Sequence, residues 1–437
     1  MKTYEEKIIT AEEAVKLVKD GDHIVTGLGA SEGRAFLSKL HLADVKDFYL
    51  SNCLPMGEYD YMKDEYKNKT NVDGWFFAPS LRRAFKNGNT SYIPNNLHAA
   101  GKARFNHRRP NIYIGVCTPP DKHGYVSLST GNTYERQAMA LADIVILEAN
   151  PKYPRTFGDV EVKVDDVDYF IEADYAPPMI PNTEPNEKDM KIGRYIADLI
   201  PDGACIQLGI GGIPNAVAKF LYEKKDLGIH TEMLTSEMAR LAKAGVINGT
   251  KKTINKGKIV TTFIMGDEEL YEFADDNPSI LVMDGGYTNN PFIIAQNDNM
   301  YSINTAVEVD LSGQVCSESI GPKQISGTGG QSDTARGAVE SNGGRSIIAL
   351  YSTQTIKNKE TGEVKVVSKI GASLTPGAAV TLHRSDVDLV VTEYGVADLR
   401  GCTVRERVQR LTAIAHPDFR QQLQEDALRL GIVGEWR

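Results

Sequence analysis

The chain repeats one α/β pattern, and this repetition restricts its possible folds more than any other feature. Residues 9–40 predict a helix, a strand, a Gly-x-Gly turn and a second helix, and residues 190–221 repeat that order. In both segments Gly and Asp stand side by side before the strand, and the turns that follow are Gly27-Leu28-Gly29 and Gly209-Ile210-Gly211. Self-similarity over units of this size is typical of duplicated domains.

Two further pairs of segments resemble one another in the same order along the chain. They are residues 111–129 with 300–319, and residues 142–150 with 387–395. In the last pair, we expect Glu148 and Glu393 to end equivalent strands. The sequence therefore predicts a duplicated α/β domain whose second copy is enlarged between residues 318 and 383.

Short runs of apolar and β-branched residues alternate with amphipathic stretches along the chain. We expect strands within residues 48–54, 111–116, 143–148, 204–209, 258–264, 279–284 and 388–393. We expect helices within residues 11–21, 213–224 and 236–246, and Thr10 with Glu13 predicts a capping box before the first. Strands that alternate with helices favour an α/β fold with largely parallel sheets. The predicted fold is a pair of similar open α/β domains.

A proline-rich stretch at residues 174–189 marks the expected domain boundary, because it has few large apolar residues and no helical or strand period. We therefore expect a first domain over residues 1–175, a linker over 176–189 and a second domain over 190–437. A chain of 437 residues is long enough for two or three domains.

Charge and hydropathy exclude several classes of protein. A net charge of −9 disfavours a polycationic surface for nucleic acid, although a local pocket can still bind an anion. No apolar run approaches the ~18 residues of a membrane span, and the N-terminus lacks a secretory signal. The five dispersed cysteines fit a reducing cytoplasm, and the eight histidines show no metal-ligand spacing. We expect no nucleic acid, membrane or metal as partner.

Ligands of open α/β sheets bind beyond the carboxyl ends of the strands, and this rule selects candidate residues in the second half. The glycine turn Gly209–Gly212 follows one strand, and three polar residues end others: Glu232, Asn304 and Glu393. Glu232 is a candidate nucleophile or general base, and Asn304 can donate amide hydrogens to a carboxylate. The plainer alternative for both glutamates is a solvated carboxylate at a strand end.

Two glycine clusters are candidate anion cradles. The turn Gly209–Gly212 precedes a helix whose N–H groups can face a phosphate or an oxyanion, and residues 326–331 form a second loop of this kind. The alternatives are a simple turn and a flexible surface loop. The dinucleotide fingerprint, the P-loop and GxSxG are absent. Four lysines lie at positions 251, 252, 256 and 258, and we interpret them as a solvated face rather than a phosphate anchor.

Four motifs together resemble the acetyl-CoA hydrolase/transferase family, and within it the 4-hydroxybutyrate and butyrate:acetate CoA-transferases. They are QLGIGGIPNAV, LGIHTEM, GPKQISGTGGQSDTARG and VVTEYGVADLRG. The resemblance runs nearly end to end. It implies two similar α/β domains with the active site between them.

The resemblance also implies roles for single residues. Glu232, in the LGIHTEM motif, would be acylated and then carry CoA as a thioester, while Asn304 and Glu393 would shape the active site. Residues that would lie along CoA are Gly209, Ile210, Gly211, Gly212, Ile213, Val307, Gly329, Gly330 and Lys369.

The implied activity is transfer of CoA between acyl-CoA and short-chain carboxylates, acetate with butyrate or 4-hydroxybutyrate, without a permanently bound cofactor. Such covalent exchange needs a carboxylate nucleophile and N–H donors for the oxyanions, which the residues supply. Alternatives are an acyl-CoA hydrolase with the same nucleophile, a non-catalytic CoA-binding protein and a sugar-phosphate isomerase. The preferred acid does not follow from the sequence. We expect a cytoplasmic homodimer or higher homo-oligomer.

Overall fold

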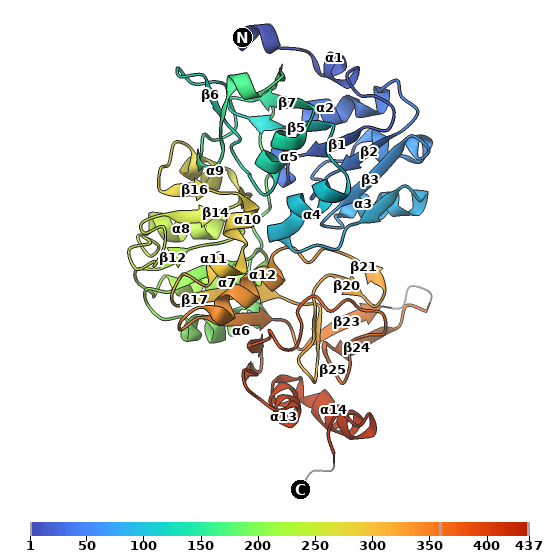
Figure 1. The fold of residues 1–437 in the computed structure, drawn as a ribbon. Coiled ribbons are helices and arrows are strands. Elements are labelled where there is room, and N and C mark those ends of the chain that lie inside the picture. The colour runs from blue at the N-terminus through green and yellow to red at the C-terminus, as the bar shows by residue number, and fades with distance from the viewer. Residues whose placement is uncertain (1, 358–360, 435–437) are drawn as a thin grey trace.

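The computed structural model describes residues 2–357 and 361–434 and contains two large, mostly parallel sheets (Figure 1). The sheet of the first half has the strand order β10-β7-β5-β1-β2-β3-β4. Its strands are β1 (His23–Thr26), β2 (Phe48–Ser51), β3 (Thr70–Gly74), β4 (Thr90–Tyr92), β5 (Ile112–Cys117), β7 (Ile144–Ala149) and β10 (Tyr169–Glu172). Nearly every residue of β1, β2 and β5 is buried, as expected for a parallel sheet covered on both faces.

The sheet of the second half has the order β12-β11-β17-β22-β26-β27, and β27 alone runs antiparallel to its neighbour. Its strands are β11 (Cys205–Leu208), β12 (Gly228–Ile229), β17 (Met300–Thr305), β22 (Arg345–Ala349), β26 (Leu389–Thr392) and β27 (Gly395–Asp398). Five strands of the first sheet, β2-β1-β5-β7-β10, have the same order as β12-β11-β17-β22-β26 in the second. This shared order supports the duplication.

The expected equivalence of Glu148 and Glu393 is wrong. In the shared strand order, β7 takes the place of β22, and β10 takes the place of β26. An aspartate gives the register: Asp168 beside β10 accepts from Val145 N of β7, and Asp388 beside β26 accepts from Ser346 N of β22. When Val145 is aligned with Ser346 and Asp168 with Asp388, Glu148 corresponds to Ala349 and Glu393 corresponds to Ala173. Two apolar strands that end in Glu were alike in composition but not in position.

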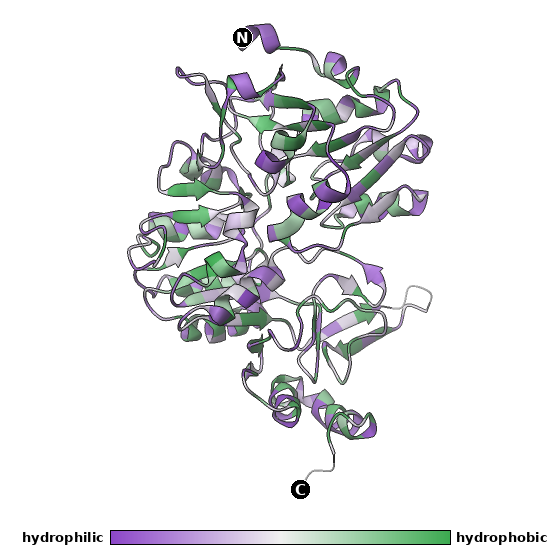
Figure 2. Ribbon diagram, viewed as in Figure 1, coloured by the Kyte–Doolittle hydropathy of each residue, from purple (hydrophilic) through white to green (hydrophobic). Residues whose placement is uncertain are grey.

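Helices surround both sheets, and their ribbons mix apolar and polar residues, whereas the strands of the sheets are mostly apolar (Figure 2). The helices of the first half are α1 (Ala11–Val15), α2 (Arg34–Lys39), α3 (Pro79–Ala84), α4 (Ala100–His107) and α5 (Glu135–Leu141). Those of the second half are α6 (Glu187–Leu199), α7 (Gly212–Leu221), α8 (Ser236–Lys243), α9 (Glu268–Ala274), α10 (Gly285–Thr288), α11 (Pro291–Ile294), α12 (Gln331–Glu340), α13 (Val404–Ile414) and α14 (Pro417–Arg429). Helices α13 and α14 lie at the C-terminal end, beyond the second sheet (Figure 1).

Short strands complete the structure, and some join the two halves. They are β6 (Tyr125–Ser127), β8 (Phe157–Gly158), β9 (Glu161–Lys163), β13 (Met233–Leu234), β14 (Ile259–Thr261), β15 (Phe263–Ile264), β16 (Ile280–Val282), β18 (Glu308–Asp310), β19 (Val315–Cys316), β20 (Ser319–Ile320), β21 (Lys323–Gln324), β23 (Thr353–Lys357), β24 (Val364–Ser368) and β25 (Ile370–Gly371). Strand β8 of the first half pairs with β16 of the second, and one hydrophobic core contains residues of both halves.

Three local predictions differ in detail from the structure. The first helix ends at Val15, although its predicted capping box of Thr10 and Glu13 is confirmed. The run at 258–264 divides into β14 and β15, because the chain changes partner strands at Thr262, whose carbonyl accepts from Asn132 N of the first half. Helix α6 begins at Glu187, inside the expected linker, because Asn186 and Asp189 form a capping box.

Candidate functional site

The predicted glycine turn connects β11 to α7 at the carboxyl edge of the second sheet. Gly211 has a φ of 110°, which glycine adopts without strain, and Gly212 faces Asp189 so closely that a Cβ there would clash with its carboxylate. Ile210 is 47% exposed whereas Ile213 is buried. The turn therefore offers its backbone and one apolar side chain to a ligand.

Glu232 lies between β12 and β13, just past the strand that was expected to end with it. Its backbone is fixed on one side, since its carbonyl accepts from Thr262 N at 3.0 Å and Phe263 N at 3.2 Å. Its side chain is partly exposed, and Asn289 Nδ2 donates to Oε2 at 2.9 Å. Glu232 is thus not a freely solvated carboxylate but a held one.

The second glycine loop meets Glu232. The Gly330 N–H hydrogen-bonds to the Glu232 carboxylate, and a Cβ on Gly330 would overlap Oε2 of that carboxylate and Nδ2 of Asn289. Gly329 has a φ of 55°, in the left-handed region that favours glycine, and packs against the ring of Phe76. Two donors, Asn289 Nδ2 and Gly330 N–H, therefore act on one carboxylate.

Burial raises the pKa of Glu232 to about 7, and the charge of Asp333 acts in the same direction. The hydrogen bonds from Asn289 and Gly330 act to lower that pKa but do not outweigh burial. Desolvation makes a carboxylate harder to ionise and leaves the ionised form poorly solvated. Above about pH 7 the site therefore presents a reactive carboxylate rather than a hydrated one.

Asn304, near the end of β17, lies within a network of polar side chains. Its Nδ2 donates to Ser302 Oγ at 2.9 Å and to Thr334 Oγ1 at 3.2 Å. Thr334 belongs to α12, the helix that begins at the Gly330 loop. Asn304 therefore supports the loop beside Glu232, and no hydrogen bond joins it to Glu232 in the part of the chain that is described.

Glu393 lies at the end of β26 and forms a second polar group, at some distance along the sheet edge. It accepts from Ser352 N at 2.8 Å and Ser352 Oγ at 2.9 Å, and Lys188 Nζ lies 3.3 Å away. Burial acts to raise the pKa of Glu393, but these partners outweigh it and the pKa is lowered. Lys369 lies near this group, where burial lowers the pKa of its ammonium and the charge of Glu393 opposes that shift.

Val307 and Lys369, the two predicted CoA contacts outside the glycine loops, lie in or beside the segment that follows β17. Lys369 Nζ donates to Ala306 O at 3.2 Å, and Val307 N donates to Cys316 O at 2.8 Å. Both residues are partly exposed. The structure thus arranges the predicted residues as a row along one sheet edge, from Glu232 past the glycine turn and Asn304 to Glu393.

A cavity of about 280 Å³ adjoins the glycine turn. Its lining combines the proline-rich segment, the turn and the start of α8: Ile180, Pro181, Asn182, Thr183, Ile210, Gly211, Asn215, Thr235, Ser236, Glu237, Met265, Gly266 and Asp267. The cavity provides room for part of a ligand that continues from the row of candidates.

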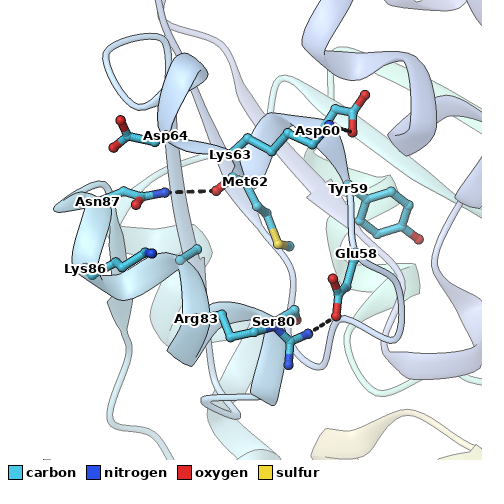
Figure 3. Close-up of a pocket in the computed structure, with 11 residues that line it drawn as sticks. Glu58, Tyr59, Asp60, Met62, Lys63, Asp64, Ser80, Arg83, Lys86 and Asn87 are labelled. Atoms are coloured by element: carbon cyan, nitrogen blue, oxygen red, sulfur yellow. Dashed lines mark hydrogen bonds and ion pairs between the residues drawn. The ribbon is translucent and has the colours of Figure 1, made fainter.

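Another hollow lies on the first half, between the turn at residues 58–64 and helix α3 (Figure 3). Its charged side chains largely pair with one another, because Arg83 contacts Glu58 and Lys63 contacts Asp60 at 2.7 Å. None of the predicted site residues lines it. It is a surface depression without a converging set of unpaired groups.

Sequence reasoning missed residues that distant segments bring to Glu232, to Gly329 and to Asp333. Asn289 follows α10, and Phe76 and His98 come from the first half, so no spacing in the sequence links them to the glutamate. Asp333 lies within the motif GPKQISGTGGQSDTARG, but no local pattern marks it as a site residue. The lysine prediction is wrong for Lys252, which is buried and donates to Ile229 O and Lys258 O at 2.8 Å.

Residues 2–357 and 361–434 lack two kinds of feature. They contain no group of three or more His, Cys, Asp or Glu placed to hold a metal ion. None of their helices has the length and apolar character to cross a membrane.

Comparison with known proteins gives matches along nearly the whole chain. Residues 1–181 match the acetyl-CoA hydrolase/transferase N-terminal domain, and residues 266–427 match the C-terminal domain. The chain is 43% identical over 430 residues to the 4-hydroxybutyrate coenzyme A transferase of Clostridium kluyveri, which covers 97% of each chain. It is 35% identical over 446 residues to the butyryl-CoA:acetate CoA-transferase of Anaerostipes caccae, covering 99% of this chain and 98% of the relative.

Solved structures agree. RipA from Yersinia pestis superposes with a TM-score of 0.90 at 35% identity, covering 98% of this chain and 99% of that one. A 4-hydroxybutyrate CoA-transferase from Porphyromonas gingivalis gives a TM-score of 0.80 at 33% identity over 98% of both chains. The chain therefore belongs to the acetyl-CoA hydrolase/transferase family.

Proposed function

We propose that this protein is an acyl-CoA:carboxylate CoA-transferase that exchanges CoA between short-chain acids, acetate with butyrate or 4-hydroxybutyrate. The observation that carries the proposal is the held carboxylate of Glu232, with two N–H donors from Asn289 and Gly330. A non-catalytic CoA-binding protein has no use for a desolvated carboxylate between such donors. The relatives named as transferases match over nearly their full length.

The proposed chemistry begins at the Glu232 carboxylate. One carboxylate oxygen attacks the acyl carbonyl of acyl-CoA, the C–S bond breaks, and a mixed anhydride and CoA thiolate result. The thiolate then attacks the glutamyl carbonyl, which forms a glutamyl-CoA thioester and releases the first acid as its carboxylate. A second carboxylate reverses these steps and regenerates Glu232.

The donors explain why the glutamyl carbonyl can be attacked. When the thiolate adds, negative charge develops on the glutamyl oxygen, and Asn289 Nδ2 with Gly330 N–H already hydrogen-bond to this carboxylate. Preorganised donors of this kind are worth ~10²–10³ in rate each. Contacts of the CoA body with the Gly209–Ile213 turn, and with Val307 and Lys369, would supply binding energy for the unfavourable first attack. Asn304 and Glu393 support the neighbouring backbone and side chains.

The proposal extends to three properties of the whole protein. CoA thioester is a substrate and no cofactor is permanently bound. The dispersed cysteines favour a reducing, cytoplasmic location. A homodimer or larger homo-oligomer is proposed, and light scattering of the purified protein measures it.

The test is an exchange panel of acetyl-CoA with butyrate, 4-hydroxybutyrate, propionate and succinate. Formation of the new acyl-CoA should depend on the added acid and give parallel double-reciprocal plots. Incubation with acyl-CoA alone, followed by borohydride, should reduce the thioester to an alcohol on the peptide that contains Glu232. The variant Glu232→Gln should lose exchange by orders of magnitude and escape the label.

Two results would contradict the proposal. CoA release that is independent of the added acid would make the protein a hydrolase, as two relatives at 28% identity are named. A label on the peptide of Glu148 or Glu393 would move the nucleophile elsewhere. Glu232→Asp is the matched comparison, because it keeps the charge but withdraws the carboxylate by one methylene. A misplacement of ~1 Å can lower the rate ~10²-fold, so exchange should fall in this variant although the charge is retained.

A further inference from the structure

A histidine of the first half and an aspartate of the second form a close pair beside Glu232. His98 lies in the short helix Leu97–Ala99, and Asp333 lies in the first turn of α12. His98 holds both carboxylate oxygens, because its Nδ1 lies 2.7 Å from Oδ1 and its backbone N donates to Oδ2 at 3.0 Å. The preceding residue adds a third contact between the halves, since Leu97 N donates to Gly329 O at 3.0 Å.

Asp333 is close to the proposed nucleophile because α12 begins at the loop that touches it. Gly330, the N-cap of α12, packs against the Glu232 carboxylate, and Asp333 follows three residues later. The Asp333 side chain is 1% exposed, so water does not screen its charge. Two carboxylates are thus placed near one another, and His98 is the basic partner of one.

The outer side of His98 faces an open hollow. This hollow is lined by His98, Lys102, Phe105, Asn106, Gln137, Leu141, Gly286 and Asn290. The His98 side chain is 34% exposed, so it can exchange protons with solvent. His98 is thus open to solvent on one side and paired with the buried Asp333 on the other, and the charge of Asp333 acts on Glu232.

Other ionisable groups also lie around His98, Asp333 and Glu232. Lys102 lies on the rim of the hollow, and Asp284 of α10 is bound by Gln137 Nε2 and Gly286 N. Glu318 beneath the glycine loop accepts from Thr328 and Thr381 hydroxyls. Cys53 of the first half is close enough to Glu232 for their charges to interact. Burial raises the pKa of its thiol, which keeps the thiol neutral. Asp333 is the charged group that acts on both His98 and Glu232.

We propose that His98 is a positioning residue whose imidazolium balances the charge of Asp333 and thereby sets the pH at which Glu232 becomes the nucleophilic carboxylate. The inference rests on the proposed role of Glu232 and adds a residue of the first half that controls it. It also gives the pairing of the two halves a chemical consequence.

The electrostatic directions agree with the geometry. The hydrogen bond to Asp333 raises the pKa of His98, which favours the imidazolium. The negative charge of Asp333 acts to raise the pKa of Glu232, so a cation on Asp333 opposes that effect. Loss of the cation should make Glu232 harder to ionise, and loss of the aspartate charge should make it easier.

The first experiment compares the pH dependence of kcat/KM for acyl-CoA in the parent, His98→Asn and Asp333→Asn. Asn places its amide nitrogen about where Nδ1 lies, so the first variant keeps a neutral hydrogen bond and removes the charge. We expect its acid limb to move up by about half a pH unit, and that of Asp333→Asn to move down by a similar amount. His123→Asn, at an exposed histidine elsewhere, is the matched control and should not move the limb.

The second experiment needs no activity and so separates this inference from the proposed function. Folding raises the pKa of Glu232 from the unfolded value of ~4.3 to about 7, so the folded protein binds a proton more tightly than the unfolded one. As the pH rises through this window, the parent therefore loses stability relative to Glu232→Gln. The loss ends near the folded pKa, above which both states are ionised. The unfolding midpoints of both proteins are measured across pH 4–9, in the parent and in the His98→Asn background. We expect the upper end of this window to shift upward in the His98→Asn background.

Opposite shifts in His98→Asn and Asp333→Asn support the inference, since a merely structural pair would not move the pH profile in two directions. The inference is overturned if His98→Asn leaves both the acid limb of the pH profile and the stability window at their parental positions, or if His98→Asn and Asp333→Asn shift the acid limb the same way. Absence of exchange in the parent would end the proposed function, while the stability measurement would still decide whether His98 controls the ionisation of Glu232. If Asp333→Asn does not fold, His98→Gln is a second variant that removes the cation, and it should raise the upper end of the window as His98→Asn does; a His98→Gln protein with the parental window overturns the inference.

Discussion

Single residues are fitted around Glu232 with little room to spare. Gly330 is the clearest case, because its Cα lies against both the carboxylate and the amide that holds it. Its φ of −99° is open to any residue, so the need for glycine is one of space and not of backbone conformation. The fit ties the glycine loop to the reacting group more directly than any motif does.

We expect Gly330→Ala to depress exchange by ~10²-fold or more, because the added methyl must displace Oε2 of Glu232 or the amide of Asn289. The measurement is kcat and KM for acyl-CoA exchange, with the larger loss in kcat. Gly434→Ala is the matched control, since a Cβ there meets nothing within 4 Å. Parental turnover in a folded Gly330→Ala protein would show that the carboxylate position is not critical.

The candidate site was predictable where one segment carries the signal. Glu232, Gly329 and Gly330 could be selected from the sequence because strand ends and glycine turns are local patterns. Asn289 and His98 could not, because each reaches the site through a contact between segments far apart in the chain. Whether the selected residues carry the proposed roles stays a prediction.

Among the elements, α6 connects the proline-rich segment to the second sheet and orients two site groups. Its capping box joins Asn186 to Asp189, whose Oδ1 accepts from Tyr351 Oη at 2.6 Å. Its first turn also contains Lys188, the cation beside Glu393. The sequence predicted a start for α6 after residue 189, which is too late. The proline-rich composition before the helix concealed the capping box of Asn186 and Asp189. Buried strands such as β5 and β7 were predicted to within one residue, since a short continuous apolar run is typical of a strand that is covered on both faces.

We expect Asn186→Ala to lower the free energy of unfolding by about 1 kcal/mol, because Lys188 N and Asp189 N lose their acceptor. Denaturant unfolding measures the loss. Asn186→Ser retains a capping oxygen and should recover most of the stability. Equal stability of the Ala and Ser variants would contradict the assigned cap.

At the scale of the whole molecule, two copies of one strand order have diverged in use. The second copy presents its carboxylate at the sheet edge, whereas Glu148 of the first is completely buried and accepts from Ala35 N, Phe36 N and Tyr175 Oη. The repeated pattern predicted the fold class, but the pairing of individual strands needed the sheet order. Domain limits at residues 175 and 190 remain a prediction.

We expect Glu148→Gln to retain nearly parental exchange, because no ligand can reach this carboxyl group. Its stability should fall by about 1–3 kcal/mol, since an amide N–H would face the donors that the carboxylate now accepts. Exchange and unfolding are measured together, beside Glu232→Gln. A large loss of exchange in a folded Glu148→Gln protein would assign the first half a direct part in the chemistry.

The contact between the first half and the glycine loop of residues 326–331 limits how this chain can be recombined with its relatives. Gly327 lies against the Trp75 carbonyl with no space for a Cβ, Phe77 N donates to Ser326 O, and Leu97 N donates to Gly329 O. These contacts are backbone to backbone, so neither side can adjust by changing a rotamer. A working hybrid of two family members must therefore inherit residues 75–98 and 326–333 from the same parent, wherever else the crossover is made.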